Sequence, residues 1–336
     1  MNTSETKDDC WARVRQSSLF NSILIVVVFL IVMTAITLAR GRMLVVRNYF
    51  VPRNSYNLIG RPSSKAVKDT KRAEHPNALN KGSARVKIVG LADLHGEMIG
   101  KNQERIVQKV REAVPDFIVY LGDMVEKTRA EKSIEPLVML TEQLVQIAPV
   151  YYVDGNHEQD VRSKKPDLYR QLNEKLDNLG ATQLEDEIVS FAVENGISVN
   201  LCGITRHYFW GDVEQELTRQ LRDMDGVNVL ACHYPESVIW YDAFDGGGVD
   251  VALCGHTHGG LIRVPFLGGM AAPEQGMWPK YDLGAFPVYT DTTWSEYGGG
   301  EDAVYLGTMI ISGGLAGEHG VLRVNNPMEV SVVVVE

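Results

Sequence analysis

A nearly continuous run of apolar residues occupies positions 19–39, close to the start of the chain. As a helix this run would be about 30 Å long, which is enough to cross the hydrocarbon core of a bilayer. A helix buried in a soluble protein would usually have a polar face, and the apolar part of a cleavable signal peptide is usually shorter, about 7 to 15 residues. We therefore predict a mixed-charge tail at 1–18 and an uncleaved transmembrane helix at 19–39.

The cationic residues on either side of this helix bear on its orientation, because Lys and Arg are enriched on the cytoplasmic side of membrane helices. Three precede the helix and four follow it: Lys7, Arg13 and Arg15, then Arg40, Arg42, Arg47 and Arg53. The excess of one charge favours a cytoplasmic C-terminal domain and leaves the side of the membrane open.

The next segment combines a strand-like stretch with a polar one. Residues 43–51 are apolar and β-branched with polar residues interspersed, which is typical of an edge strand. Residues 53–84 are rich in Ser, Lys, Asn and Pro, as in a linker or a mobile insertion. We interpret 40–84 as a linker that contains the edge strand, and 85–336 as one large domain.

From residue 86 onward, apolar runs of strand length alternate with segments whose apolar residues recur at helical spacing. Such a series predicts parallel strands covered by helices. Strands are predicted at 86–91, 117–121 and 150–153, and helices at 102–114, at 134–146 with Pro136 in the first turn, and at 167–179.

The second half of the domain follows a different pattern. It begins with a predicted hairpin, whose two strands meet at Asn195-Gly196. A short helix and three further strands follow, so the sheets of this α/β domain are expected to be mixed. The hairpin strands are predicted at 187–193 and 197–202, the helix at 213–221, and the later strands at 227–232, 250–254 and 331–335.

Charge and cysteine content narrow the choice of partners. The 336 residues carry a formal net charge of -10, so no nucleic-acid partner is expected. The four cysteines follow no Cys-x-x-Cys spacing, which indicates neither a zinc ribbon nor a disulfide framework. An acidic protein can still bind phosphates where metal cations reverse the local field.

Five of the predicted strands end in residues that can bind a metal or transfer a proton. In an open α/β sheet the carboxyl ends of the strands lie on one rim, so these residues are expected to converge. Five of the eight histidines are among them, which scattered core or surface histidines would not produce. The residues are Asp93 and His95, Asp123, Asn156 and His157, His233, and His256 and His258.

In this order the motifs Asp-x-His, Gly-Asp, Gly-Asn-His-Glu, a lone His and Gly-His-Thr-His resemble the signature of the calcineurin-like metallophosphoesterase superfamily. The resemblance covers residues 86 to about 316, and the segments 261–265 and 276–281 look like its bacterial membrane-associated phosphodiesterase branch. It implies a four-layer α/β/β/α sandwich with mixed sheets. It also implies a hydrolase that cleaves a phosphodiester or pyrophosphate bond by attack of a hydroxide bridging two metal ions.

The resemblance further implies a role for each residue of the signature. Asp93, His95 and His258 would bind one metal ion, Asn156, His233 and His256 the second, and Asp123 would bridge the two. His157 would be the catalytic imidazole. Glu126 stands where phosphatases of this superfamily have an Asp that orients this histidine, and Leu261 stands where the bacterial branch usually has Gln.

The ligand types bear on the identity of the two divalent ions. Carboxylates together with imidazoles suit Mn²⁺, Fe or Zn²⁺ better than Ca²⁺ or Mg²⁺. A purely structural zinc site would be compact and closed, unlike this set. The alternative from another functional class is a non-catalytic metal-binding scaffold for protein interaction, but such relatives usually lose ligands that are all present here.

Several features of the sequence bear on the substrate. The membrane helix and the aromatic residues Tyr234, Trp240, Trp278 and Tyr281 suggest a lipid-linked phosphoester, although aromatics at such places are as often core residues. Some enzymes that this chain resembles cleave the pyrophosphate of UDP-diacylglucosamine, and we expect this compound as the specific substrate. Arg206, His207 and Arg263 are candidate substrate contacts, against an ordinary surface or supporting role.

Overall fold

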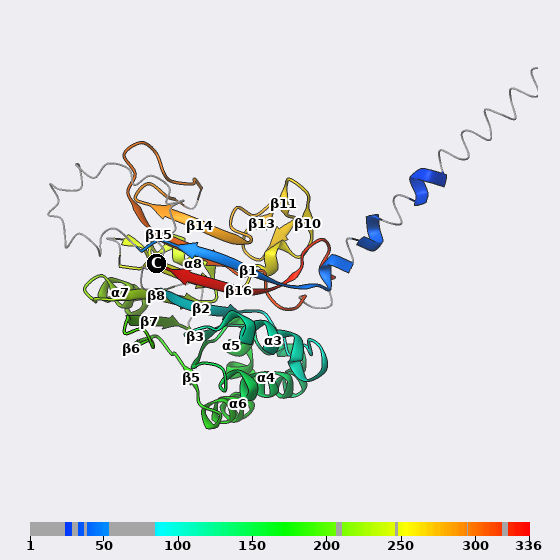
Figure 1. Ribbon diagram of the computed structural model, residues 1–336, viewed down its shortest axis with the longest axis horizontal. Helices are drawn as coiled ribbons and strands as arrows, with labels where there is room; N and C mark the ends of the chain where they lie inside the picture. The colour runs from blue at the N-terminus through cyan, green and yellow to red at the C-terminus, as the bar shows by residue number, and fades with distance from the viewer. Residues whose placement is uncertain are drawn as a thin grey trace, which may run out of the picture.

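The computed structural model describes residues 24–28, 33–36, 39–53, 85–205, 210–245, 248–293, 295–317 and 322–336. Within these residues two six-stranded mixed sheets pack face to face, and helices cover the outer face of each (Figure 1). Buried apolar side chains from both sheets, among them Phe117, Val119 and Val229, fill the space between them. The predicted four-layer α/β/β/α sandwich with mixed sheets is confirmed.

The first sheet has the strand order β1-β16-β2-β3-β4-β5. β2, β3, β4 and β5 run parallel, whereas β16 is antiparallel to β2. The expected edge strand is present as β1, which pairs only with β16 in this sheet. The strands are β1 (Leu44–Val51), β2 (Val86–Leu91), β3 (Phe117–Leu121), β4 (Val150–Val153), β5 (Ala181–Gln183) and β16 (Met328–Val335).

Four helices pack on the outer face of the first sheet, where their apolar faces form a second core with the strands. Two predictions need correction. Helix α4 begins at Ala130, so Pro136 lies in its interior and not in its first turn, and Val114 ends α3 with an exposed side chain. The helices are α3 (Glu104–Ala113), α4 (Ala130–Leu144), α5 (Asn156–Lys164), which was not predicted, and α6 (Pro166–Asn178).

The second sheet has the strand order β14-β15-β9-β8-β7-β6, and β6 and β7 form the predicted hairpin. Strands β7, β8, β9 and β15 run parallel. α7 (Asp212–Leu221) and α8 (Pro235–Trp240) lie on its outer side. Its strands are β6 (Glu187–Ala192), β7 (Ser198–Ile204), β8 (Val227–Cys232), β9 (Val251–Cys254), β14 (Gly284–Tyr289) and β15 (Tyr305–Ile311).

Two small hairpins project from the end of β9, and we call residues 263–278 the hairpin lobe. Their strands have only two residues each and contain several glycines, so no periodic pattern marked them in the sequence. They are β10 (Arg263–Val264) paired with β11 (Gly268–Gly269), and β12 (Ala271–Ala272) paired with β13 (Gly276–Met277).

One helix in the described part of the chain, Leu24–Gly41, is long and apolar enough to cross a membrane, and 8% of it is buried. This exposure is unlike that of a core helix. The helix ends two residues beyond the predicted span, while residues 19–23 of that span, the tail at 1–18 and most of the polar stretch at 53–84 lie outside the described residues. In Figure 1 the helix leaves the domain beside the hairpin lobe.

Candidate metal centre

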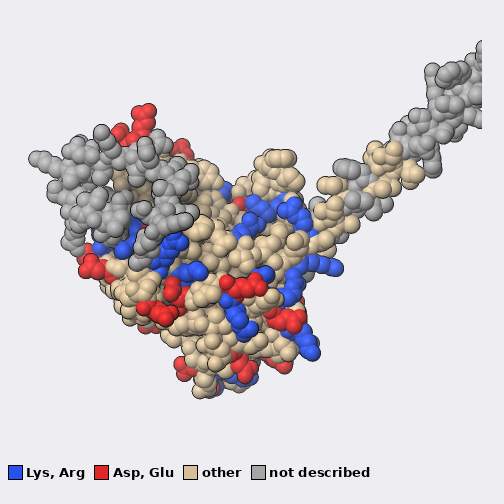
Figure 2. All heavy atoms as spheres, viewed as in Figure 1, with Lys and Arg blue, Asp and Glu red and all other residues tan. Residues whose placement is uncertain are grey.

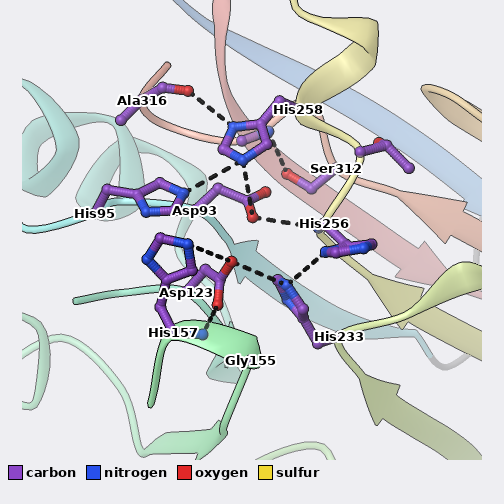
Figure 3. A network of polar contacts seen from close by, with 12 residues as sticks. Asp93, His95, Asp123, Gly155, His157, His233, His256, His258, Ser312 and Ala316 are labelled. Atoms are coloured by element: carbon purple, nitrogen blue, oxygen red, sulfur yellow. Dashed lines mark hydrogen bonds and ion pairs between the residues drawn. The ribbon is translucent and has the colours of Figure 1, made fainter. Parts of the chain in front are cut away.

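The predicted ligands come together where strands of the two sheets end. Asp93 and His95 follow β2, Asp123 follows β3, and Asn156 and His157 begin α5 directly after β4. The second sheet contributes His233 after β8, and His256 and His258 after β9. Figure 3 shows the aspartate and histidine side chains of this set pointing toward one another from both sheets. The expected convergence at the carboxyl ends of the strands is therefore present.

The first group of potential metal ligands consists of Asp93, His95 and His258. The Nε2 atoms of His95 and His258 are 3.3 Å apart, and Nε2 of His258 is 3.8 Å from Oδ1 of Asp93. All three side chains are buried. These distances leave the donor atoms around a single point, as a bound cation would require.

The second group consists of Asp123, His233 and His256. Nε2 of His233 lies 3.2 Å from Oδ2 of Asp123 and 3.2 Å from Nδ1 of His256. Asp123 also groups with His95 and His157, so its carboxylate lies between the two sets of ligands. This is the position that a bridging carboxylate would take.

The outward nitrogen of each of four imidazoles faces an oxygen atom. Nδ1 of His233 donates to the carbonyl of Leu121 at 2.7 Å, and Nδ1 of His258 donates to that of Ala316 at 3.1 Å. Nε2 of His256 is 2.6 Å from Oε2 of Glu274, and Nδ1 of His95 is 3.4 Å from Oε2 of Glu126. With a proton on the outward nitrogen, the inward nitrogen of each neutral ring has a lone pair, which is the tautomer that binds a metal.

His157 has the opposite arrangement. Its Nδ1 accepts a hydrogen bond of 3.3 Å from the backbone N–H of Lys127, so in the neutral ring the proton is on Nε2. Nε2 faces the site, 3.9 Å from Oδ2 of Asp123. Burial lowers the pKa of His157 to about 4, although the negative charge of Asp123 acts in the opposite direction. The low pKa keeps the ring neutral. His157 therefore offers the site a proton donor and not a lone pair.

Glu126 lies between two imidazoles and not beside His157 alone. Its Oε2 is 3.4 Å from Nδ1 of His95, and its Oε1 is 3.5 Å from Nδ1 of His157. Burial alone would raise the pKa of this carboxyl, but the contact with His95 and the N–H and hydroxyl of Thr128 hold it well below its usual range. As an anion it can accept the Nδ1–H of His95 and so orient that ring, whereas Nδ1 of His157 accepts from Lys127 and has no proton to donate to it. The role of Glu126 in orienting His157 stays a prediction.

Two buried oxygens test whether a cation fits these residues. Oδ2 of Asp93 and Oδ1 of Asn156 are buried without a hydrogen-bond partner in the described part of the chain. Burying such acceptors unpaired is costly, so each calls for a ligand. Burial would lower the pKa of His233, yet the charge and hydrogen bond of Asp123 raise it to about 10, so the site attracts positive charge. The residues present thus fit divalent cations.

The backbone is unusual at the same positions. Non-glycine residues rarely have positive φ, because the Cβ atom then crowds the neighbouring carbonyl. Such strain persists where the surrounding structure enforces it, commonly at functional sites. Five of the predicted ligands have it: Asp93 (φ 55), His95 (φ 49), Asp123 (φ 53), His256 (φ 72) and His258 (φ 51).

The start of α5 fixes Asn156, His157 and the loop that carries Asp123. Glu158, at the third helical position, accepts hydrogen bonds of 2.8 to 2.9 Å from the N–H groups of Gly155, Asp123 and Val125. A side chain at Gly155 would collide with the carboxylate of Asp123. Glu158 therefore caps the start of α5 and in addition ties two strand-end loops together.

Glu274 is a residue of the site that the sequence did not reveal. It lies in the turn between β12 and β13, with φ of 58, and its carboxylate holds the outward nitrogen of His256. The neighbouring Gln275 fixes the turn through hydrogen bonds to Glu236 and to the carbonyl of Tyr281. No motif or spacing connects Glu274 with His256, so only the fold brings them together.

Of the three candidate substrate contacts, Arg263 is the one that lies within the described residues. Arg206 and His207 lie outside the described residues. Nη1 of Arg263 donates to the carbonyl of Gly259 at 2.8 Å and to Oδ2 of Asp282 at 2.7 Å, which ties the base of the hairpin lobe to the loop that carries His258. For Arg263 a supporting role is thus visible, and a contact with substrate stays a prediction.

Comparison with known proteins matches residues 86–260 to the family model described as Calcineurin-like phosphoesterase. The uncharacterized protein YpbG of Bacillus subtilis is 30% identical over 206 residues, which span 60% of this chain and 72% of that protein. Phosphodiesterase YaeI of Escherichia coli is 28% identical over 207 residues, or 61% and 72% of the two chains.

Among solved structures, a purple acid phosphatase, PPD1 from yellow lupin, is similar with a TM-score of 0.35 and 16% identity, over 52% of this chain and 38% of that one. The phosphopantetheinyl hydrolase PptH of Mycobacterium tuberculosis has a TM-score of 0.32 and 15% identity, over 52% and 83%. Because both TM-scores are low, the fold is assigned from the two sheets of this chain and not from its similarity to these structures.

Proposed function

This chain belongs to the calcineurin-like phosphoesterase family and is a metal-dependent phosphoesterase, and on that premise we propose a membrane-anchored enzyme with two metal sites. One site would be formed by Asp93, His95 and His258, and the other by Asn156, His233 and His256, with Asp123 shared between them. The observation that carries this proposal is the set of contacts made by five imidazoles. The outward nitrogen of four of them faces an oxygen atom, which leaves the inward nitrogen for a metal, whereas Nδ1 of the fifth, His157, accepts a backbone N–H.

The protein groups divide the work between binding and proton transfer. Divalent cations at these positions, with Mn²⁺ as the first candidate and Fe or Zn²⁺ as others, would activate water and neutralise phosphoryl oxygens for an in-line displacement. Nε2–H of His157 would donate to the leaving oxygen. Glu126 would hold the ring of His95, the backbone N–H of Lys127 that of His157, and Glu274 that of His256, so that each nitrogen keeps its direction.

The shared carboxylate gives the first test of two metal sites. Asp123→Asn replaces one oxygen of a group that lies in both sets of ligands, so both ions should be lost together and turnover of a soluble diester such as bis(p-nitrophenyl) phosphate should fall to background. Metal content and rate are measured on the full chain in detergent after chelation and reloading with Mn²⁺.

Asp167→Asn, at an exposed ion pair with Arg170 on α6, is the control and should change neither quantity. Loss of one ion only from Asp123→Asn would contradict the shared role. A wild-type protein that binds two ions and hydrolyses no phosphoester would instead be a metal-binding scaffold.

For the substrate, we propose a lipid-linked phosphodiester or pyrophosphate such as UDP-diacylglucosamine. What supports this is the exposed apolar helix Leu24–Gly41, which ends beside the domain that carries the site. Of the four aromatic residues that suggested a lipid-linked substrate, Tyr234 and Tyr281 are buried, whereas Trp240 and Trp278 are exposed. Rates on lipid pyrophosphates and on soluble diesters in the same detergent test the proposal, and turnover of soluble diesters alone would overturn it.

A further inference from the structure

We propose that the hairpin lobe, residues 263–278, rests on the surface of the bilayer beside the N-terminal helix and holds the metal centre at the lipid–water boundary. This inference deepens the proposed function and rests on its membrane anchor. It assigns a second membrane contact to a part of the domain that is remote in sequence from the anchor.

The lobe exposes large apolar side chains in the turn of its first hairpin and at the final strand of its second. Phe266 is fully exposed, Leu267 is 66% exposed, and Met277 and Trp278 are 60% and 50% exposed. Phe266 and Trp278 have positive φ, at 68° and 58°, a conformation that costs energy for bulky residues. Four such side chains on one small projection are unusual for a surface in water, and Trp and Phe are typical of the membrane interface.

The lobe is joined to the end of the apolar helix through a single segment. Gly41, the last residue of the helix, packs so closely on the backbone of Arg323 that any side chain there would collide with it. The next residue, Val324, exchanges backbone hydrogen bonds with Leu261 and Arg263 at the base of the lobe, at 3.2 and 3.0 Å. Figure 1 shows the lobe and the helix on the same side of the molecule.

The surface between the helix and the lobe has the chemistry of a lipid headgroup contact. Leu322 and Met43 are exposed there, at 63% and 51%. Arg40, Arg42 and Arg105 are exposed around the end of the helix, and Arg105 donates to the carbonyl of Arg42. Figure 2 shows Lys and Arg side chains gathered where the helix leaves the domain. Basic residues beside apolar ones suit anionic phospholipids.

A cleft on the same face is lined in part by a residue that supports the metal centre. It has a volume of about 470 Å³, and its lining includes Gly41 and Leu322 from this face as well as Leu315 and Ala316. The carbonyl of Ala316 is the one that fixes His258. The lobe itself reaches the other ligand set through Glu274. A bilayer on this face would therefore lie near residues that support one imidazole of each ligand set, which suits a phosphoester with acyl chains.

Depth-dependent quenching on the full chain tests the contact. In a Cys10→Ser background the remaining cysteines are buried, so a fluorophore can be attached at Phe266→Cys. Val213→Cys is the matched control, because Val213 is also apolar and 61% exposed but lies on α7, away from the lobe. Each labelled protein is reconstituted in vesicles of phosphatidylethanolamine with phosphatidylglycerol, and its metal content and soluble-diester rate confirm that it is folded.

Lipids brominated on their acyl chains should quench the label at 266 and not that at 213, while aqueous iodide should quench at 213 several-fold more strongly. Equal access of iodide to both labels would overturn the proposal. Phe266→Ser/Leu267→Ser should raise the KM for a long-chain phosphodiester in vesicles several-fold and leave soluble-diester turnover unchanged. If the wild type hydrolyses neither substrate, the proposed function fails, while the two labels still report the position of the lobe.

Discussion

Helices α5 and α7 begin with closely similar structures. Gly155 and Gly211 precede them with nearly the same backbone angles, φ of −102° and −90°, ψ of −170° and −167°. In each, the glycine N–H donates to Oε2 of a glutamate at the third helical position, Glu158 or Glu214, at 2.8 Å. The starting sequences are Gly-Asn-His-Glu and Gly-Asp-Val-Glu.

The two helix starts differ in what surrounds them. α5 follows the carboxyl end of β4, in the middle of the converging strand ends, and Glu158 also accepts the N–H groups of Asp123 and Val125. Among the described residues, Gly211 is the one donor recorded for Glu214. His157 is buried in the site, whereas Val213, at the matching position, is exposed. One local structure thus serves as an ordinary helix cap in α7 and as part of the candidate metal centre in α5.

The largest difference is expected when each glycine becomes alanine. In Gly155→Ala the new methyl group would meet the carboxylate and backbone of Asp123, whereas in Gly211→Ala its nearest neighbour is Oε2 of Glu214 at 3.3 Å. We expect Gly155→Ala to lose metal and activity and about 3 kcal/mol of unfolding free energy. Gly211→Ala should lose less than about 1 kcal/mol. Urea unfolding and metal analysis measure both, and similar losses would remove the distinction between the helices.

The next difference is expected when the second helical residue, His157 in α5 and Val213 in α7, is truncated to alanine. His157→Ala removes the inward N–H but none of the proposed ligands, so both metal ions should remain while turnover falls by about 10² to 10⁴. Val213→Ala should leave turnover unchanged, since Val213 is exposed on α7. Steady-state rates on a soluble diester, with metal content measured in the same samples, check this. Full activity of His157→Ala would exclude it as the proton donor.

A smaller difference is expected when each glutamate becomes glutamine. The two oxygens of Glu158 accept three N–H groups, and an amide NH₂ in place of one oxygen would face a donor. We expect Glu158→Gln to reduce the free energy of unfolding by about 2 kcal/mol. Glu214→Gln keeps an oxygen for Gly211 and should lose only about 0.5 kcal/mol or less. Equal effects in urea unfolding would show that the extra donors to Glu158 contribute nothing.

The burial of each element explains which elements could be predicted from the sequence. β2, β3 and β8 are buried along nearly their whole length, so they appear in the sequence as continuous apolar runs with clear ends. The polar residues that follow such runs could be placed at one rim, which is why the convergence of the candidate ligands was foreseeable. α5 was missed because its sequence, NHEQDVRSK, is polar and is held by its cap and by packing on α6.

The supporting atoms of the site leave no trace in the sequence. The carbonyls of Leu121 and Ala316 fix two imidazoles, and any residue could supply a carbonyl at those positions. Glu274 reaches His256 through a turn between two-residue strands. Glu126 was identified through the family pattern, but its contact with His95 depends on the path of the loop after β3. Such long-range contacts are properties of the fold.

The smallest effect is expected when the sequence of the α5 start is moved to α7. Asp212→Asn with Val213→His gives α7 the same Gly-Asn-His-Glu sequence, with the same capping glutamate. Because no strand-end carboxylates or other imidazoles of the described residues converge there, we expect no additional bound metal and a change of less than about 0.5 kcal/mol in unfolding free energy. In a His157→Ala background the transplant should restore no turnover. Metal stoichiometry and rates test both points, and a third bound ion would mean that the tetrapeptide, and not its place on the rim, creates the site.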